Sequence, residues 1–171
     1  SIAADNLIPL VREGAHTAVM AAARTHTGDL VVVKAACSAL QNLAGAADNC
    51  VQLVHDGAHT AVMAATREFS GDVELARHLC VMLFNLTCTD GSFAPLLRDG
   101  VHTAMMAAAR SHATDVVVAR AACSTLQNLA TAADTCLPLL RDGAHTAVMA
   151  LARDHAGDVG VARAACRTLQ G

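Results

Sequence analysis

Apolar residues recur along this 171-residue chain at helical spacing, in segments separated by Gly and Asp. In one such segment Val33, Cys37, Leu40 and Ala44 lie three or four residues apart, which places them on one face of a helix. The β-branched run LVVV at 30–33 is the one place where a strand is suggested. Because it follows an Asp of N-cap type and continues into KAACSALQNLA, we predict a helix there too.

The same pattern returns every 43 residues. A Gly, a His followed by Thr-Ala, and an Asp all share this spacing, at Gly14, Gly57, Gly100 and Gly143, at His16, His59, His102 and His145, and at Asp29, Asp72, Asp115 and Asp158. Four units at 6–48, 49–91, 92–134 and 135–171, the last one shorter, occupy almost the whole chain. Because no unit buries its apolar face alone, we predict one domain over 1–171 formed by stacked repeats.

Each repeat is predicted to hold three helices. Residues of N-cap type open the first, at Asn6, Asn49, Ser92 and Thr135. This first helix ends at the Gly, a residue that suits the left-handed conformation after a helix end. The second helix starts near His-Thr-Ala, and the Asp caps a third, longest helix. A two-helix repeat of the HEAT kind is the alternative, and the Gly inside each unit favours three helices.

Composition and charge exclude several classes of function. Aromatic residues make up 2% of the chain, with no Trp or Tyr, which argues against aromatic cages and base-stacking surfaces. A net charge of −3 gives no overall attraction to nucleic acid or to an anionic membrane. No apolar stretch reaches the roughly 18–20 residues needed to span a bilayer. We expect neither nucleic acid nor membrane among the partners.

Seven cysteines are present, an odd number, and none forms a CxxC pair. Four of them follow the repeat, at Cys37, Cys80, Cys123 and Cys166. No charged segment followed by an apolar one opens the chain, so we expect small core residues in a reducing cytoplasm or nucleus. A disulfide framework or a thiolate metal site is the alternative.

The nine histidines do not indicate a metal site. Stacked helices lie about 8–10 Å apart, whereas zinc needs its nitrogen ligands at about 2.0–2.1 Å, so histidines one repeat apart do not share an ion. The same holds for a second set, His26, His112 and His155. We expect these side chains to bond a helix end or a loop carbonyl. Because no nucleotide-binding or nucleophile motif is present either, we predict no cofactor, no metal and no enzyme activity.

The repeat resembles the armadillo family. The stretch NCVQLVHDGAHTAVMAATREFSGDVELARHLCVMLFNLT follows that family's unit nearly end to end: a short capped helix, a Gly kink, an aliphatic helix, an acidic cap and a long helix. The variant with RAACSTLQNLA is similar to armadillo units of eukaryotic repeat proteins and of large leucine-rich-repeat kinases. The resemblance implies an all-α, right-handed α-solenoid of four armadillo repeats, three helices per 43-residue repeat.

The resemblance also implies a concave groove lined by the third helices. In the family an Asn near the end of that helix bonds the backbone of an extended peptide; here that position is Asn42, Asn85 and Asn128, and Gly171 in the last unit. Nuclear-import adaptors carry a Trp four residues earlier. Ser38, Val81, Ser124 and Arg167 stand there instead, so we predict that the chain is not such an adaptor.

Positions three, four and seven residues apart share the third-helix face with the Asn. The predicted partner-binding residues are Lys34, Ser38, Gln41, Asn42, Arg77, Val81, Phe84, Asn85, Arg120, Ser124, Gln127, Asn128, Arg163, Arg167 and Gln170. Amides suit a peptide backbone, cations suit carboxylates, and Phe84 is the candidate hot spot. Alternatively, the cations are solvated or pair with neighbouring acids such as Asp72 and Asp115, the Asn side chains bond loop carbonyls, and Phe84 packs locally.

We therefore predict a protein-interaction scaffold that binds an extended acidic peptide segment. The alternative function is structural: an assembly module, taken from a longer array or engineered, that self-associates end to end because neither end resembles the polar cap that solenoids need.

Overall fold

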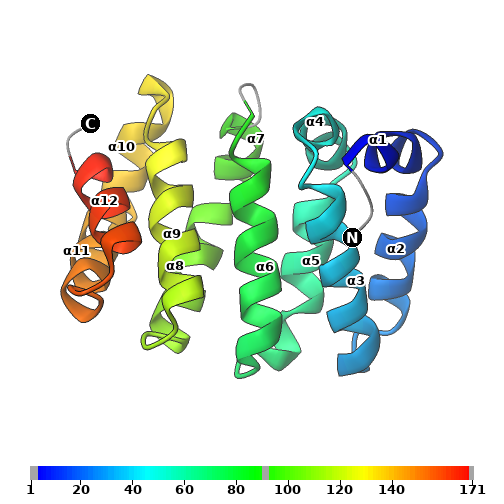
Figure 1. Cartoon of the computed structure of the whole chain (residues 1–171), viewed down its shortest axis with the longest axis horizontal. Coiled ribbons are helices and arrows are strands. Elements are labelled where there is room, and N and C mark those ends of the chain that lie inside the picture. Colours follow the sequence, from blue (N-terminus) through cyan, green and yellow to red (C-terminus); the bar gives the residue numbers. More distant parts are fainter. Residues whose placement is uncertain (1–3, 90–92, 170–171) are drawn as a thin grey trace. The chain divides into compact units, whose positions relative to one another are not determined.

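A computed structural model of the chain describes residues 4–89 and 93–169, which form twelve α-helices and one short 3-10 helix (Figure 1). The first helices of the repeat are α1 (Ala4–Arg12), α4 (Ala47–His55), α7 (Phe93–Arg98) and α10 (Ala133–Arg141). The second helices are α2 (Ala15–Thr25), α5 (Ala58–Ala65), α8 (Val101–Ser111) and α11 (Ala144–Asp154). The third helices are α3 (Leu30–Leu43), α6 (Val73–Leu86), α9 (Val116–Leu129) and α12 (Val159–Thr168).

The all-α prediction is confirmed over the described ranges, in which no residue is assigned to a strand. The LVVV run is helical, as predicted, because it lies in the first turn of α3 behind a capping Asp29. Three helices recur in each 43-residue period, so the two-helix alternative is wrong. In the second period α5 ends early, and the 3-10 helix η1 (Arg67–Phe69) continues it.

Glycine and aspartate set the boundaries between helices. The Gly between first and second helices has a φ between 76° and 84° in all four periods, a left-handed conformation that side chains with a Cβ rarely adopt. At each third helix an Asp carboxylate accepts a hydrogen bond from the helix's own first turn; Asp29, for example, accepts from the N–H groups of Val31 and Val32. Both predicted boundary signals are confirmed.

The predicted caps of the first helices are wrong where the structure describes them. Helices α4 and α10 begin at Ala47 and Ala133, so Asn49 and Thr135 lie inside them and are buried. Asn49 Nδ2 donates to the carbonyl of Leu43 at 2.9 Å, and Thr135 Oγ1 donates to the carbonyl of Leu129. These side chains therefore satisfy carbonyls at the end of the preceding third helix. Asn6 likewise lies inside α1, and Ser92 lies outside the described residues.

The chain forms two compact units, Ser1–Ser92 and Phe93–Gly171, each containing two periods. Within each unit like helices lie side by side: α3 contacts α6 and α2 contacts α5 in the first, and α9 contacts α12 and α8 contacts α11 in the second (Figure 1). Leu40 and Leu83 are fully buried in the first core, as are Val118 and Leu129 in the second. This stacking of equivalent helices is the packing of an α-solenoid. Among the described residues no helix combines the length and apolar composition needed to cross a membrane.

Candidate functional site

The third helices place most of the predicted partner-binding residues on two surfaces, one in each unit. We call them the α3–α6 surface and the α9–α12 surface. On the first, Lys34 near the start of α3 contacts Asp72 and Glu74 near the start of α6, while Gln41 near the end of α3 contacts Asn85 near the end of α6. The two helices therefore run in the same direction, and predicted residues of successive periods lie next to one another.

The cation of the α3–α6 surface is held by the neighbouring period. Lys34 Nζ lies 2.9 Å from a carboxylate oxygen of Asp72 and 2.8 Å from one of Glu74. The hydrogen bonds that the Lys34 ammonium donates to Glu74 and Asp72 raise the pKa of Lys34. The backbone N–H of Leu75 and the Lys34 ammonium lower the pKa of Asp72. Lys34 therefore follows the alternative interpretation, in which a cation pairs with acids of the next repeat.

The amides of this surface also contact their neighbours. Gln41 Oε1 lies 2.8 Å from His78 Nδ1, and Asn85 Nδ2 donates to the carbonyl of Gln41 at 3.4 Å. Val81 and Phe84 are half-buried beside them. Of the remaining predicted residues on this surface, Ser38 is half-buried, and Asn42 and Arg77 are exposed. The α3–α6 surface thus combines neutralised charge, amides and an apolar patch.

The α9–α12 surface has a different charge distribution. Arg120 forms a bidentate pair with Asp158, with nitrogen–oxygen distances of 2.9 and 2.6 Å. The Arg120 guanidinium and the N–H of Val161 hold the pKa of Asp158 well below its usual range. Arg163 and Arg167 are exposed, and neither has an ion pair with any described residue.

The amides of the α9–α12 surface lie on α9. Ser124, Gln127 and Asn128 are half-buried on α9. Gln170 and the Gly171 position lie outside the described residues. Among the described residues of this surface, three arginines (Arg120, Arg163 and Arg167) stand against the one acid paired there, Asp158.

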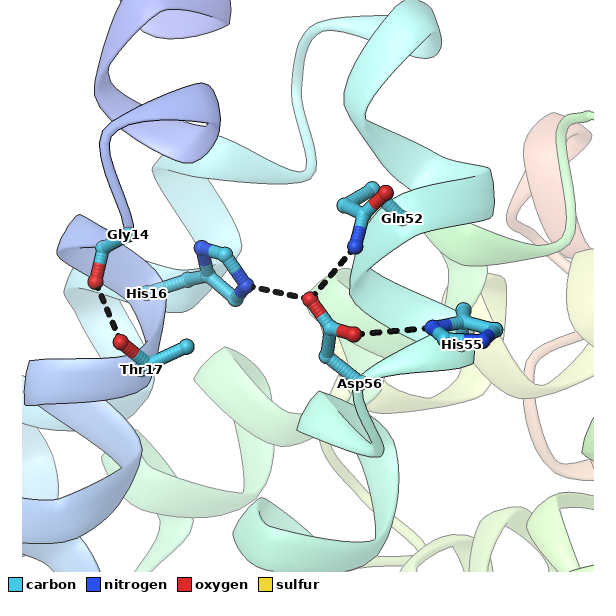
Figure 2. A network of polar contacts seen from close by, with 6 residues as sticks. All are labelled: Gly14, His16, Thr17, Gln52, His55 and Asp56. Atoms are coloured by element: carbon cyan, nitrogen blue, oxygen red, sulfur yellow. Dashed lines mark hydrogen bonds and ion pairs between the residues drawn. The ribbon is translucent and has the colours of Figure 1, made fainter.

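A second set of polar contacts joins successive periods and was not predicted from the sequence. His16 at the start of α2 points at Asp56, which follows α4, with 2.7 Å between His16 Nε2 and Asp56 Oδ2 (Figure 2). Gln52 Nε2 donates to the same carboxylate at 2.7 Å, and His55 Nδ1 lies 2.9 Å from its other oxygen. Hydrogen bonds from Gln52, His55 and His16 hold the pKa of Asp56 well below its usual range.

His16, Gln52 and Asp56 of this network line a cavity of about 460 Å³ in the first unit, to which Arg12 and Asp48 also contribute. The second unit repeats its central contact, because His102 Nε2 lies 2.7 Å from Asp142 Oδ2. The sequence contains the signal: an acid precedes each repeated Gly, at Glu13, Asp56, Asp99 and Asp142, 40 residues after a His in the last three cases. Finding these pairs requires knowing that the end of the first helix of one period faces the start of the second helix of the period before it, as α4 faces α2.

One histidine contacts a loop carbonyl, the kind of partner predicted for these side chains. His155 Nε2 lies 2.7 Å from the carbonyl of Ala113, which is a loop carbonyl one period earlier. Within the described ranges no three His, Cys, Asp or Glu side chains gather in a way that would hold a metal ion.

The repeated cysteines are mostly core residues, as predicted. Cys37, Cys80 and Cys123 are buried, whereas Cys166 is exposed in the last period. Burial raises the pKa of the Cys37 thiol to about 12 and that of Cys123 to about 11. Thiols of this kind are poor nucleophiles at neutral pH, because the thiolate is the reactive form.

Comparison with known proteins agrees with this architecture. Residues 1–134 match the family model described as the LRRK2 ARM repeat. No curated protein and no solved structure matches the chain. The matched residues include the whole α3–α6 surface and the α9 half of the second surface, and armadillo repeats of this kind are protein-interaction scaffolds. The stacked three-helix periods and this match show that the chain belongs to the LRRK2 ARM repeat family.

Proposed function

We propose that each unit binds an extended peptide segment of a partner protein along its third-helix surface, and that the segment bound by the α9–α12 surface is acidic. Exposed Arg163 and Arg167, which have no ion pair within the described residues, carry the proposal. The proposed activity is binding, with no chemical step.

The amides supply the sequence-independent part of the interaction. An extended backbone offers N–H and C=O groups at regular spacing, and Asn or Gln side chains satisfy both kinds. Asn42 on α3 is exposed, and its equivalent on α6, Asn85, is half-buried. Gln127 on α9 is also half-buried and lies one residue before the equivalent position of that helix. Asn85 Nδ2 already donates to the carbonyl of Gln41, so its binding costs less side-chain entropy than it would for an unrestrained side chain.

The charges supply the preference for acidic residues. Helices α9 and α12 with their caps carry Arg120, Arg163 and Arg167 against two acids, Asp115 and Asp158. The corresponding elements of the first unit carry Lys34 and Arg77 against three acids, Asp29, Asp72 and Glu74. We therefore expect acidic peptides to bind α12 of the second unit, and uncharged peptides to bind α3 and α6 of the first.

Fluorescence anisotropy with a labelled acidic peptide and its Glu→Gln counterpart tests this assignment. The double variant Arg163→Gln/Arg167→Gln is expected to bind the acidic peptide about tenfold more weakly, since a hydrogen bond to a charged group contributes roughly 1.5–3 kcal/mol. The matched control is Arg153→Gln, an exposed arginine on α11. Equal loss in the control, or equal affinity of the wild type for both peptides, would contradict the charge preference.

The amide assignment needs a separate variant. Asn42→Ala/Asn85→Ala is expected to weaken binding of acidic and neutral peptides alike, and Asn6→Ala, an exposed residue of α1, is the control. Undiminished binding by the double variant would remove the α3–α6 surface from the proposal.

The proposed compartment is a reducing one, the cytoplasm or nucleus. It is supported by the buried thiols of Cys37 and Cys123, which act as small core side chains.

A further inference from the structure

Two cysteines of the first unit, Cys50 and Cys88, lie outside the series that recurs every 43 residues. Cys50 belongs to α4, and Cys88 follows Leu86, the last residue of α6, by two positions. The equivalent positions of the first and third periods hold no cysteine; they are Leu7 with Gly45, and Phe93 with Thr131. The two thiols are therefore a feature of the second period and not of the repeated framework.

Contacts between α4 and the end of α6 bring these two cysteines together. The carbonyl oxygen of Asn85, in the last turn of α6, accepts the Cys50 thiol at 3.5 Å and the backbone N–H of Cys88 at 3.1 Å. The residue after Cys88 also reaches α4, because Thr89 Oγ1 donates to the carbonyl of Ala47 at 3.5 Å. Cys88 thus lies between two residues that contact α4 at or near Cys50.

The two thiols differ in exposure. Cys50 is 1% exposed, whereas Cys88 is an exposed residue. Burial raises the pKa of the Cys50 thiol, a hydrogen bond with Thr89 opposes this shift, and the neighbouring Cys88 raises the pKa further. A small oxidant therefore reaches Cys88 first, while Cys50 is a protonated thiol beside it at neutral pH.

The present hydrogen bonds of the two thiols are weak ones. Cys88 Sγ donates to the carbonyl of Phe84 at 3.4 Å, and Cys50 Sγ also lies 3.5 Å from the carbonyl of Ala44. Because S–H is a weak donor, little opposes a turn of the exposed Cys88 side chain from the Phe84 carbonyl toward Cys50.

We propose that Cys50 and Cys88 form a redox-sensitive pair, which hydrogen peroxide converts into a disulfide between α4 and the turn after α6. The Cys88 thiolate attacks one peroxide oxygen, and the O–O bond breaks. Cys88 becomes a sulfenic acid, and the other oxygen leaves as hydroxide, which the proton lost by Cys88 turns into water.

The second step closes the disulfide. The Cys50 sulfur attacks the sulfenic sulfur of Cys88, the S–O bond breaks, and the departing hydroxide takes the Cys50 proton to form a second water. Two thiols are oxidised to one disulfide, and one peroxide is reduced to two waters. A dithiol reductant reverses the reaction by thiol–disulfide exchange. Such a reversible disulfide suits a reducing compartment, where disulfides are transient or redox-sensing.

Mapping by mass spectrometry tests the pair in the chain alone, so the result does not depend on peptide binding. After treatment with hydrogen peroxide, the remaining thiols are alkylated in denaturant without reductant. Digestion before Asp separates Cys50 from Cys37, because Asp48 lies between them. Fragmentation of the linked peptides then distinguishes Cys88 from Cys80. We expect one peptide pair joined through Cys50 and Cys88, which dithiothreitol abolishes.

Serine variants assign the two roles. Cys88→Ser is expected to lose the disulfide and to leave Cys50 unoxidised, because Cys50 is buried. Cys50→Ser is expected to lose the disulfide and to accumulate a sulfenic acid at Cys88, which dimedone labels and which the wild type consumes. Circular dichroism verifies that each variant is folded.

Two further cysteines supply matched controls. Cys166→Ser removes another exposed cysteine. Cys136→Ser removes the equivalent of Cys50 in the second unit, whose thiol donates to the equivalent carbonyls of Ala130 and Ala132. Both variants are expected to keep the disulfide between Cys50 and Cys88.

Three results overturn the proposal. One is a wild-type chain in which peroxide yields no peptide pair joined through Cys50 and Cys88. Another is equal dimedone labelling of Cys88 in the wild type and in Cys50→Ser. The third is loss of the disulfide in Cys166→Ser. If Cys50→Ser does not fold, the wild-type map and the exposed Cys88→Ser variant decide the matter.

Discussion

The two units share a fold but differ in how their third-helix surfaces use charge. On the α3–α6 surface Lys34 is held between Asp72 and Glu74, and Phe84 and Val81 add an apolar patch. On the α9–α12 surface one carboxylate, Asp158, is taken up by Arg120, and two further arginines are exposed on α12. The comparison teaches that a repeated framework fixes where side chains stand, whereas the unrepeated residues decide the charge and polarity of each surface.

The largest expected effect tests whether equivalent positions are packed equally. Leu40 in the first unit and Leu126 in the second are 0% and 1% exposed. Replacing either by Ala is expected to lower the free energy of unfolding by about 2–5 kcal/mol, because a buried cavity is left. Urea unfolding measures this. Leu137→Ala, at a 74% exposed position, is the control and is expected to change stability little. A loss at Leu40 but not at Leu126 would show that the two cores are not equivalent.

The glycines give the next largest effect. Gly100 has a φ of 81°, and a Cβ added there would lie 3.1 Å from Thr103 Oγ1. Gly100→Ala is expected to cost roughly 1–2 kcal/mol, because an L side chain disfavours the left-handed region. At Gly71 nothing lies within 4 Å of an added Cβ and φ is outside the left-handed region, so Gly71→Ala is expected to be neutral or slightly stabilising. Thermal unfolding compares the stability of the two variants, and a Gly100→Ala chain as stable as Gly71→Ala would contradict the argument.

The apolar patch gives an effect on binding. Phe84 stands where the third period has Gln127, so Phe84→Gln makes the first unit resemble the second. If Phe84 is a hot spot, peptide affinity falls about tenfold, or ~1.4 kcal/mol. Because Phe84 is half-buried, urea unfolding accompanies the anisotropy measurement. Unchanged affinity would mean that Phe84 only packs locally.

Local chemistry explains which parts of the fold the sequence predicts. The Asp caps and the left-handed glycines act within one turn of their own position, so Asp29 and Gly100 have the same role in any context that preserves the helix. Asn49 and Thr135 have the same capping chemistry, yet both are used to bond carbonyls of a preceding helix. That choice depends on which helix lies beside them, which a local pattern does not contain.

The candidate site shows the same division. The register of the third helix places Lys34, Gln41 and Asn85 on one surface, as predicted, because helical periodicity is local. The pairing of Lys34 with two acids, and of His16 with Asp56, depends on the offset between neighbouring periods. Once that offset is known from one pair, the equivalent pairs follow along the sequence.

The smallest expected effect is on the pH dependence of stability, and it distinguishes the His16–Asp56 contact from the His102–Asp142 contact. Asp56 accepts hydrogen bonds from Gln52, His55 and His16, and these donors depress its pKa. Asp142 contacts one of the described side chains, His102. When folding lowers the pKa of a carboxylate, its ionised form stabilises the fold at any pH above the pKa that the group has in the unfolded chain. This stabilisation is lost as the pH falls toward the lower pKa that the group has in the folded chain. Stability should therefore decline between about pH 5 and pH 2, in part because of Asp56.

Asp56→Asn is expected to reduce that decline, since Asn does not titrate, and Asp142→Asn, at the equivalent position of the second unit, is the comparison. Urea unfolding across this pH range measures both slopes, with Asp48→Asn, an exposed acid of α4, as the control. Equal slopes in the Asp56 and Asp142 variants would show that the added donors Gln52 and His55 contribute nothing, and that the two units differ in the chemistry of their third-helix surfaces but not in the contacts between their periods.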